Sequence, residues 1–169
     1  MTSAQLLADA FGRIRDTVHN AVRGLTPEQL AFRLDSHANT IAWLVWHLTR
    51  IQDDHIAHAA QAEQVWTSGE WAGQFRLPFD RRATGYGQSS ANVAAVRVES
   101  GDLLTAYHDA VYEHTVGFVS GVTDTDLARI IDDRWDPPVT LGVRLVSIIS
   151  DDLQHAGQAA FIRGVIERR

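Results

Sequence analysis

Helical spacing of apolar residues over four long segments is the feature that most limits how this chain can fold. The segments are residues 3–23, 39–61, 102–119 and 141–167. No segment shows the sustained alternation of apolar and polar residues that is typical of a strand. Amphipathic helices bury their apolar faces against one another around a shared core. The sequence therefore predicts an all-α protein, a four-helix bundle in a single domain that spans residues 1–169.

Helix start signals support this division of the chain. Thr26 begins a Thr-Pro-Glu-Gln sequence typical of a capping box, which we expect to open only a short turn. Ser100 and Thr140 precede the third and fourth long helices and can accept hydrogen bonds from their first backbone N–H groups. A shorter helical pattern over 91–98 comes before the third long helix.

A long connection, residues 62–90, joins the second and third helices and shows no clear periodicity. Segments of this length without periodicity are typical of functional loops, or contain short elements that the pattern does not resolve. Its Trp66 and Trp71 could cover a site or plug the core. Arg82 and Tyr86 could supply a cation and a hydroxyl group to an anionic substrate, and the alternative is a plain surface turn.

Composition excludes several classes of function. The chain has 169 residues and a formal net charge of −6, and an acidic surface disfavours a nucleic-acid partner. It contains no Cys, so it has no disulfide, no thiolate zinc site and no cysteine nucleophile. The longest apolar run is far too short for a membrane span, and the N-terminus lacks a signal-peptide pattern. We therefore expect a cytoplasmic protein without a membrane partner.

Polar residues on the apolar stripes indicate a metal site. Asp151 and His155 are four residues apart, so their Cβ atoms lie about 5–6 Å apart on one helix face. On the second helix, His47 lies between Leu44 and Leu48 and is expected to point inward. A core carboxylate without a partner is costly, and a divalent cation bound by both His and the Asp would remove that cost.

Two His and one carboxylate leave open positions on a zinc-like ion, as catalytic sites require. The residue types suit zinc, nickel or iron(II). The alternative is that Asp151 lies at the rim in water and that both His residues are satisfied core residues. We interpret His55 and His58 as part of a solvated rim, and Trp43 as packing away from the His47 stripe.

Two motifs resemble those of a known superfamily. The segment from Asn39 to Leu48, NTIAWLVWHL, resembles the second-helix signature of the DinB/YfiT-like superfamily. The segment from Asp151 to Gln158, DDLQHAGQ, resembles its fourth-helix signature, which is usually His-x-x-x-His-x-Gly-Gln. The resemblance extends over nearly the whole chain, including the long connection between helices 2 and 3.

The resemblance implies a four-helix bundle that holds one divalent metal with His47, Asp151 and His155. Asp151 replaces the more common His, and this carboxylate resembles the mycothiol-dependent maleylpyruvate isomerase branch, where an acidic residue and two His hold zinc. The superfamily also includes S-transferases that use mycothiol or bacillithiol. A homodimer is expected from the resemblance only.

These observations lead to one main functional hypothesis and two alternatives. The metal would activate a low-molecular-weight, mycothiol-like thiol for S-transfer to, or isomerisation of, a small electrophile. Gln158 would hydrogen-bond a ligand or substrate at the metal, and its alternative role is helix packing. The competing hypotheses are a non-catalytic metal- or ligand-binding bundle and a metal-dependent hydrolase, which would act without added thiol.

Overall fold

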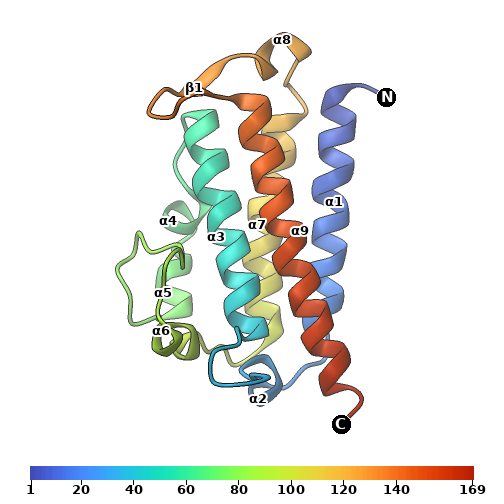
Figure 1. Ribbon diagram of the computed structural model, residues 1–169, viewed down its shortest axis with the longest axis vertical. Coiled ribbons are helices and arrows are strands. Elements are labelled where there is room, and N and C mark those ends of the chain that lie inside the picture. The colour runs from blue at the N-terminus through green and yellow to red at the C-terminus, as the bar shows by residue number, and fades with distance from the viewer.

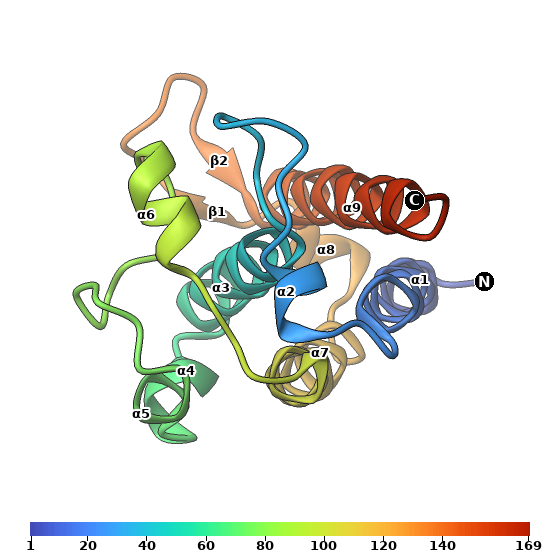
Figure 2. The same cartoon turned by 90° about the horizontal axis from the view of Figure 1, so that it is seen from below.

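Four long helices lie side by side along the longest axis of the molecule (Figure 1). The computed structural model describes residues 1–169, and the long helices are α1 (Ser3–Val22), α3 (Ile41–Ala60), α7 (Gly101–Val119) and α9 (Leu141–Ile166). Helix α1 packs against α7 and α9, and α3 packs against the same two helices, which closes a bundle (Figure 2). The predicted all-α four-helix bundle is confirmed.

Short elements fill the connections and the ends of the bundle. The short helices are α2 (Pro27–Leu30), α4 (Val65–Ser68), α5 (Trp71–Phe75), α6 (Ser90–Ala95) and α8 (Asp124–Leu127). Strands β1 (Ile130–Asp132) and β2 (Val139–Thr140) form a small antiparallel pair that the sequence did not predict. The long connection therefore contains α4 and α5, whose length is too short to give a periodic pattern.

The N-cap residues predicted from the sequence are found at the starts of their helices. Thr26 forms a capping box at α2, and the hydroxyl groups of Ser100 and Thr140 accept hydrogen bonds from the first turns of α7 and α9. Thr40 does the same for α3, where it accepts from the Trp43 backbone N–H at 2.9 Å. Each hydroxyl group satisfies a helix N–H that has no partner within the helix. The start of α3, which carries His47, is thus fixed by its own sequence.

Helix α3 is the most enclosed element. Every residue from Ile41 to Arg50 is buried, because α7 and α9 cover two sides of the helix and the long connection covers a third (Figure 2). The apolar residues among them belong to a hydrophobic core of 31 buried side chains. A polar side chain on this part of α3 is therefore taken out of water and needs a partner inside the protein.

The inward stripe of α9 differs from the predicted one. Asp152 and Ala156 are fully buried, whereas Asp151 and His155 are only partly buried. The physical reason is that α9 packs against both α1 and α3, so Asp152 faces the interior and Asp151 lies at the edge of the contact. The predicted inward positions of Asp151 and His155 are corrected accordingly.

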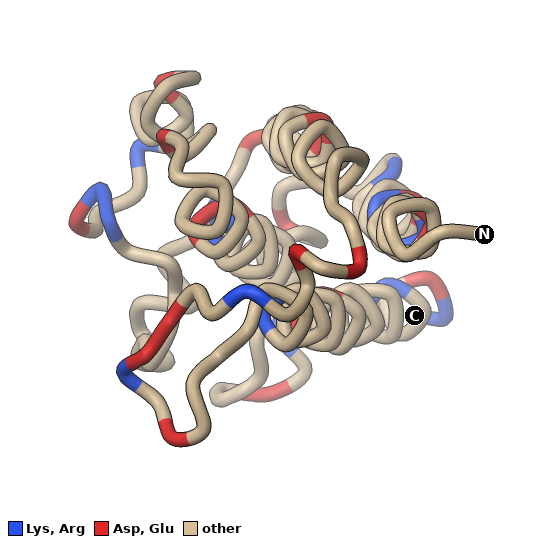
Figure 3. Tube along the Cα trace, turned by 90° about the horizontal axis from the view of Figure 1, so that it is seen from above, with Lys and Arg blue, Asp and Glu red and all other residues tan.

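Charged residues are spread over the molecule. In the view of Figure 3, Arg positions are interspersed with Asp and Glu positions along the helices and loops. None of the helices is both long enough and apolar enough to span a membrane.

Candidate metal centre

His47, Asp151 and His155 come together across the contact between α3 and α9. One potential ligand atom from each residue lies within 4.8 Å of the others. His47 lies in the buried N-terminal half of α3. Asp151 and His155 lie at the partly exposed edge of α9. The three residues singled out from the sequence thus form one cluster, although His47 lies more than 100 positions before the other two in the chain.

The surroundings of His47 fix its tautomer. Its Nδ1 lies 2.6 Å from the Thr84 carbonyl oxygen, which can only accept, so Nδ1 must donate. Nε2 then carries the free lone pair, the form that binds a metal. Burial lowers the pKa of His47, which favours the neutral ring. His47 is therefore prepared as a ligand before any ion arrives.

Asp151 and His155 offer the other two ligand atoms. His155 Nδ1 lies 3.1 Å from Gln158 Oε1, while its Nε2 lies 3.6 Å from Asp151 Oδ1. Asp151 Oδ2 is buried and has no hydrogen-bond partner in the protein. A buried carboxylate oxygen without a partner is unfavourable, and a cation bound between these groups would satisfy it. The residues present therefore fit a divalent metal.

An aromatic wall lines the cluster. The Trp43 ring stacks on His47 with 4.5 Å between ring centroids, and its edge faces His155 at 6.2 Å. Trp43 Nε1 donates to Gln88 Oε1 at 2.8 Å, which orients the indole. The prediction that Trp43 packs away from His47 was wrong. Residues four apart on a helix share a face, so the sequence already contained this signal.

The loop from Arg81 to Gly85 supports His47 from outside α3. Gly85 has φ of +95°, and a Cβ there would lie 2.6 Å from His47 Nδ1 and 3.1 Å from Trp46 Cζ3. Only glycine allows both this backbone conformation and this close approach. The loop can therefore bring the Thr84 carbonyl oxygen against the imidazole.

A buried network holds the same loop in place. Arg50, one turn after His47, is fully buried, and its Nε donates to the Ala83 carbonyl oxygen at 3.2 Å. Trp66 Nε1 donates to the Arg81 carbonyl oxygen at 2.8 Å, and the Arg50 guanidinium lies over the Trp66 ring. Three backbone carbonyl groups within four residues are thus fixed by buried side chains of α3 and α4.

Asp53 balances the charge of Arg50. Its Oδ2 lies 3.5 Å from Arg50 Nη1 and accepts from the Tyr107 hydroxyl at 2.8 Å. The backbone N–H groups of Val65 and Trp66 also donate to Asp53, each at 2.8 Å. This network was not identified from the sequence. The spacing of Arg50 and Asp53 within an apolar helix was the available signal.

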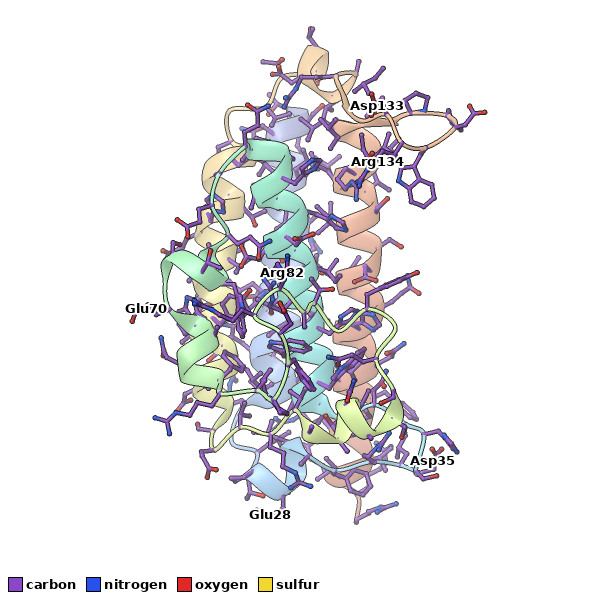
Figure 4. The ribbon with its side chains drawn as sticks, turned by 90° about the vertical axis from the view of Figure 1, so that its left-hand side faces the viewer. Glu28, Asp35, Glu70, Arg82, Asp133 and Arg134 are labelled. Atoms are coloured by element: carbon purple, nitrogen blue, oxygen red, sulfur yellow. The ribbon has the colours of Figure 1, made fainter.

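The remaining candidates lie apart from the cluster. His55 faces Arg144, whose Nη1 lies 3.1 Å from the ring, and His58 is exposed. Arg82 pairs with the neighbouring Asp80 and its side chain is 93% exposed. Tyr86 is 89% exposed. Figure 4 shows Arg82 and the chain around it in front of α3. Only Gln158 of the predicted substrate contacts touches a candidate ligand.

Asp152 is a second buried carboxyl group next to Asp151. It is fully buried, and neither side-chain oxygen has a hydrogen-bond partner. Burial raises the pKa of Asp152 well above its ordinary value, with the neighbouring Asp151 charge acting in the same direction. Both effects disfavour the charged form of this carboxyl group.

The fold and the cluster define a class of protein, the DinB/YfiT-like four-helix bundles, here with two imidazoles and a carboxylate between two helices. The family model described as mycothiol S-transferase matches residues 6–168. The chain belongs to this family.

A solved structure supports the fold. The crystal structure of a conserved protein of Enterococcus faecalis is 27% identical in sequence and superposes with a TM-score of 0.92. The match covers 100% of this chain and 99% of that one. No curated protein matches the chain.

Proposed function

We propose that this protein is a metal-dependent S-transferase that joins a low-molecular-weight, mycothiol-like thiol to a small electrophile. The observation that carries the proposal is the cluster of His47, Asp151 and His155 ligand atoms within 4.8 Å, in a member of the mycothiol S-transferase family. Because the chain has no Cys, the reacting sulfur must come from a second molecule. We further propose zinc as the metal, since two imidazoles and one carboxylate are typical ligands of catalytic zinc.

The contacts of His47, Asp151 and His155 indicate which atom each would offer to the metal. His47 and His155 would each present Nε2, because Nδ1 of each ring is engaged by Thr84 or Gln158. Asp151 would contribute the negative charge. When bound with open positions, a divalent metal lowers the pKa of a coordinating thiol, so that the thiolate forms near neutral pH.

The protein's own part is to exclude water and to orient the ligands. His47 is only 6% exposed, and the Trp43 ring covers one face of its imidazole. A low-dielectric wall on one side strengthens electrostatic interactions within the site. Asp151 and His155 remain partly exposed, so substrates reach the centre from the α9 side.

The test combines metal analysis with a conjugation assay. Purified untagged protein is analysed for bound metal and then assayed with mycothiol and a fluorogenic bimane electrophile. We expect one equivalent of metal and thiol conjugation that depends on it. His155→Ala should lose most of both, by about 100-fold in rate, while His58→Ala should keep both.

Competing functions give different results in the same experiment. A hydrolase would cleave an activated ester at the same rate with and without thiol. A non-catalytic bundle would bind stoichiometric metal but would not accelerate conjugation of any thiol, and that result would reject the proposal. Full metal content in both His47→Ala and His155→Ala would reject the triad itself.

A further inference from the structure

A cavity of about 500 Å³ opens between the segment after α2 and the C-terminal half of α9. In Figure 4 the labelled Asp35 marks this segment, which lies beside α9. The lining residues are Leu34, His37, Ala38, Asn39, Leu44, Gly157, Gln158, Phe161 and Ile162. The volume lies in the range of sites that bind small organic molecules.

This cavity adjoins the candidate metal centre. Gln158 lines it, and Gln158 Oε1 is also the partner of His155 Nδ1 at 3.1 Å. Leu44, on the opposite wall, precedes His47 on α3 by three residues, about 5 Å along the helix axis. A molecule in the cavity therefore lies about one helical turn from the candidate ligands.

The lining selects for an uncharged, apolar occupant. Five of the nine lining residues are hydrophobic, and none is Asp, Glu or Arg. Leu34 and Phe161 are 39% and 61% exposed, so a ligand that covers them gains from burial of apolar surface. The amides of Asn39 and Gln158 and the imidazole of His37 supply the few polar groups that orient a ligand in such sites.

Two other cavities of similar size lack this connection. One, of about 470 Å³, is lined by residues of α5 and its surroundings, including Glu70 and Arg81. Another, of about 470 Å³, lies between the end of α3 and β1, including His58 and Arg129. Neither contains a residue of the metal cluster or one bonded to it.

We propose that the cavity beside Gln158 binds the apolar substituent of the electrophile that receives the thiol sulfur. The inference rests on the proposed function and adds to it a substrate class, uncharged electrophiles that carry an alkyl or aryl group.

A series of N-alkylmaleimides, from methyl to hexyl, tests the substrate class. In this reaction the thiol sulfur bonds to one alkene carbon and the thiol proton goes to the other, so nothing leaves and no oxidant is needed. After subtraction of the uncatalysed rate, kcat/KM should rise about two- to fourfold per added methylene. The increase reflects the apolar surface that the cavity buries.

Two Leu substitutions on α9, one inside the cavity at Gly157 and one outside it at Ala160, form a matched pair. A Cβ at Gly157 would meet no atom within 4 Å, so the position has room for a larger side chain, and Gly157→Leu is designed to occupy part of the cavity. Gly157→Leu should abolish the increase of kcat/KM with chain length. Ala160→Leu, on the exposed side of α9 but outside the cavity, should keep the dependence.

Binding of unreactive N-alkylsuccinimides separates this inference from the proposed function. With metal-loaded protein, N-hexylsuccinimide should shift the backbone NMR signals of residues 157, 158 and 161, and Gly157→Leu should remove the shifts. Turnover that is indifferent to chain length, or the absence of such shifts, would overturn the inference and leave the proposed function standing. Binding without any thiol conjugation would reject the proposed function instead.

Discussion

Gly85 and Gly87 are two glycines of one loop that differ in what surrounds them. Both have positive φ, +95° and +68°, so a side chain strains the backbone at either position. A Cβ at Gly85 would lie 2.6 Å from His47 Nδ1, whereas a Cβ at Gly87 meets nothing within 4 Å. Substitutions at the two glycines therefore distinguish the effect of backbone strain in the loop from the effect of a steric clash with the His47 ring.

We expect Gly85→Ala to lower metal affinity by about 10-fold or more, because the added carbon displaces the imidazole from the Thr84 carbonyl oxygen. Competition with a chromophoric chelator measures the affinity. Both variants should lose about 1–3 kcal/mol of stability, because Ala strains a backbone with positive φ. Gly87→Ala should nevertheless bind metal as tightly as the parent protein does. Equal metal affinity in the two variants would show that contact with Gly85 does not position His47.

At this scale the sequence identified the candidate ligands that the structure brings together, but not the groups that support them. His47 and the Asp151–His155 pair stand out because polar residues on an apolar stripe are rare and because two of them are four apart. The Thr84 carbonyl oxygen and the tight approach of Gly85 involve backbone from a loop without periodicity. Nothing in the residue types of that loop indicates which carbonyl group reaches an imidazole 37 positions away.

Arg50 connects α3 to the loop that supports His47. We expect Arg50→Lys to lower metal affinity by about 10-fold, because Lys keeps the charge beside Asp53 but lacks the Nε–H that bonds the Ala83 carbonyl oxygen. Isothermal titration with zinc measures the effect. The absorption bands of the cobalt-substituted protein should also change, since they report ligand geometry.

Tyr107→Phe is the control for Arg50→Lys. It removes the hydroxyl that donates to Asp53 at 2.8 Å and accepts from Arg50 Nη1 at 3.4 Å, but it leaves the Arg50 Nε bond to the Ala83 carbonyl oxygen in place. We expect about 1 kcal/mol of lost stability with unchanged metal affinity and an unchanged cobalt spectrum. If Tyr107→Phe and Arg50→Lys alter metal binding equally, the network acts through stability and has no specific effect on His47.

The long helices could be predicted from the sequence because apolar spacing and capping residues agree along each one. The inner face of α9 could not be decided in the same way. From Ile148, a step of three leads to Asp151 and a step of four to Asp152, and both steps keep a residue on one helix face. Both positions carry the same side chain, so only the packing of α9 against α1 and α3 separates them.

Elements α4 and α5 were beyond prediction for another reason. Their four and five residues give no helical period. The start of α4 is held by the carboxylate of Asp53, which accepts from the Val65 and Trp66 backbone N–H groups. A helix start that depends on a residue 12 positions earlier in the chain has no local sequence signal.

Across the whole molecule, the core and the candidate metal centre are largely independent. The core of 31 buried side chains runs through the bundle, while the cluster joins α3 to α9 at one level of their contact. The bundle is therefore expected to keep its shape without metal. Bound metal would add stability, since a ligand that binds only the folded state favours it.

Removal of the metal should accordingly lower the melting temperature while the helical circular dichroism at 25 °C stays unchanged. With free zinc at about 1,000 times its dissociation constant, the stabilisation is about 4 kcal/mol, which corresponds to about 8–16 °C for a chain of this size. Thermal melts with excess zinc and with a chelator measure the difference. His155→Ala should melt at the same temperature under both conditions, because it lacks one of the three ligands. A zinc-dependent shift of the same size in His155→Ala would place the stabilising metal elsewhere, and loss of helical signal on chelation would show that the bundle itself depends on the ion.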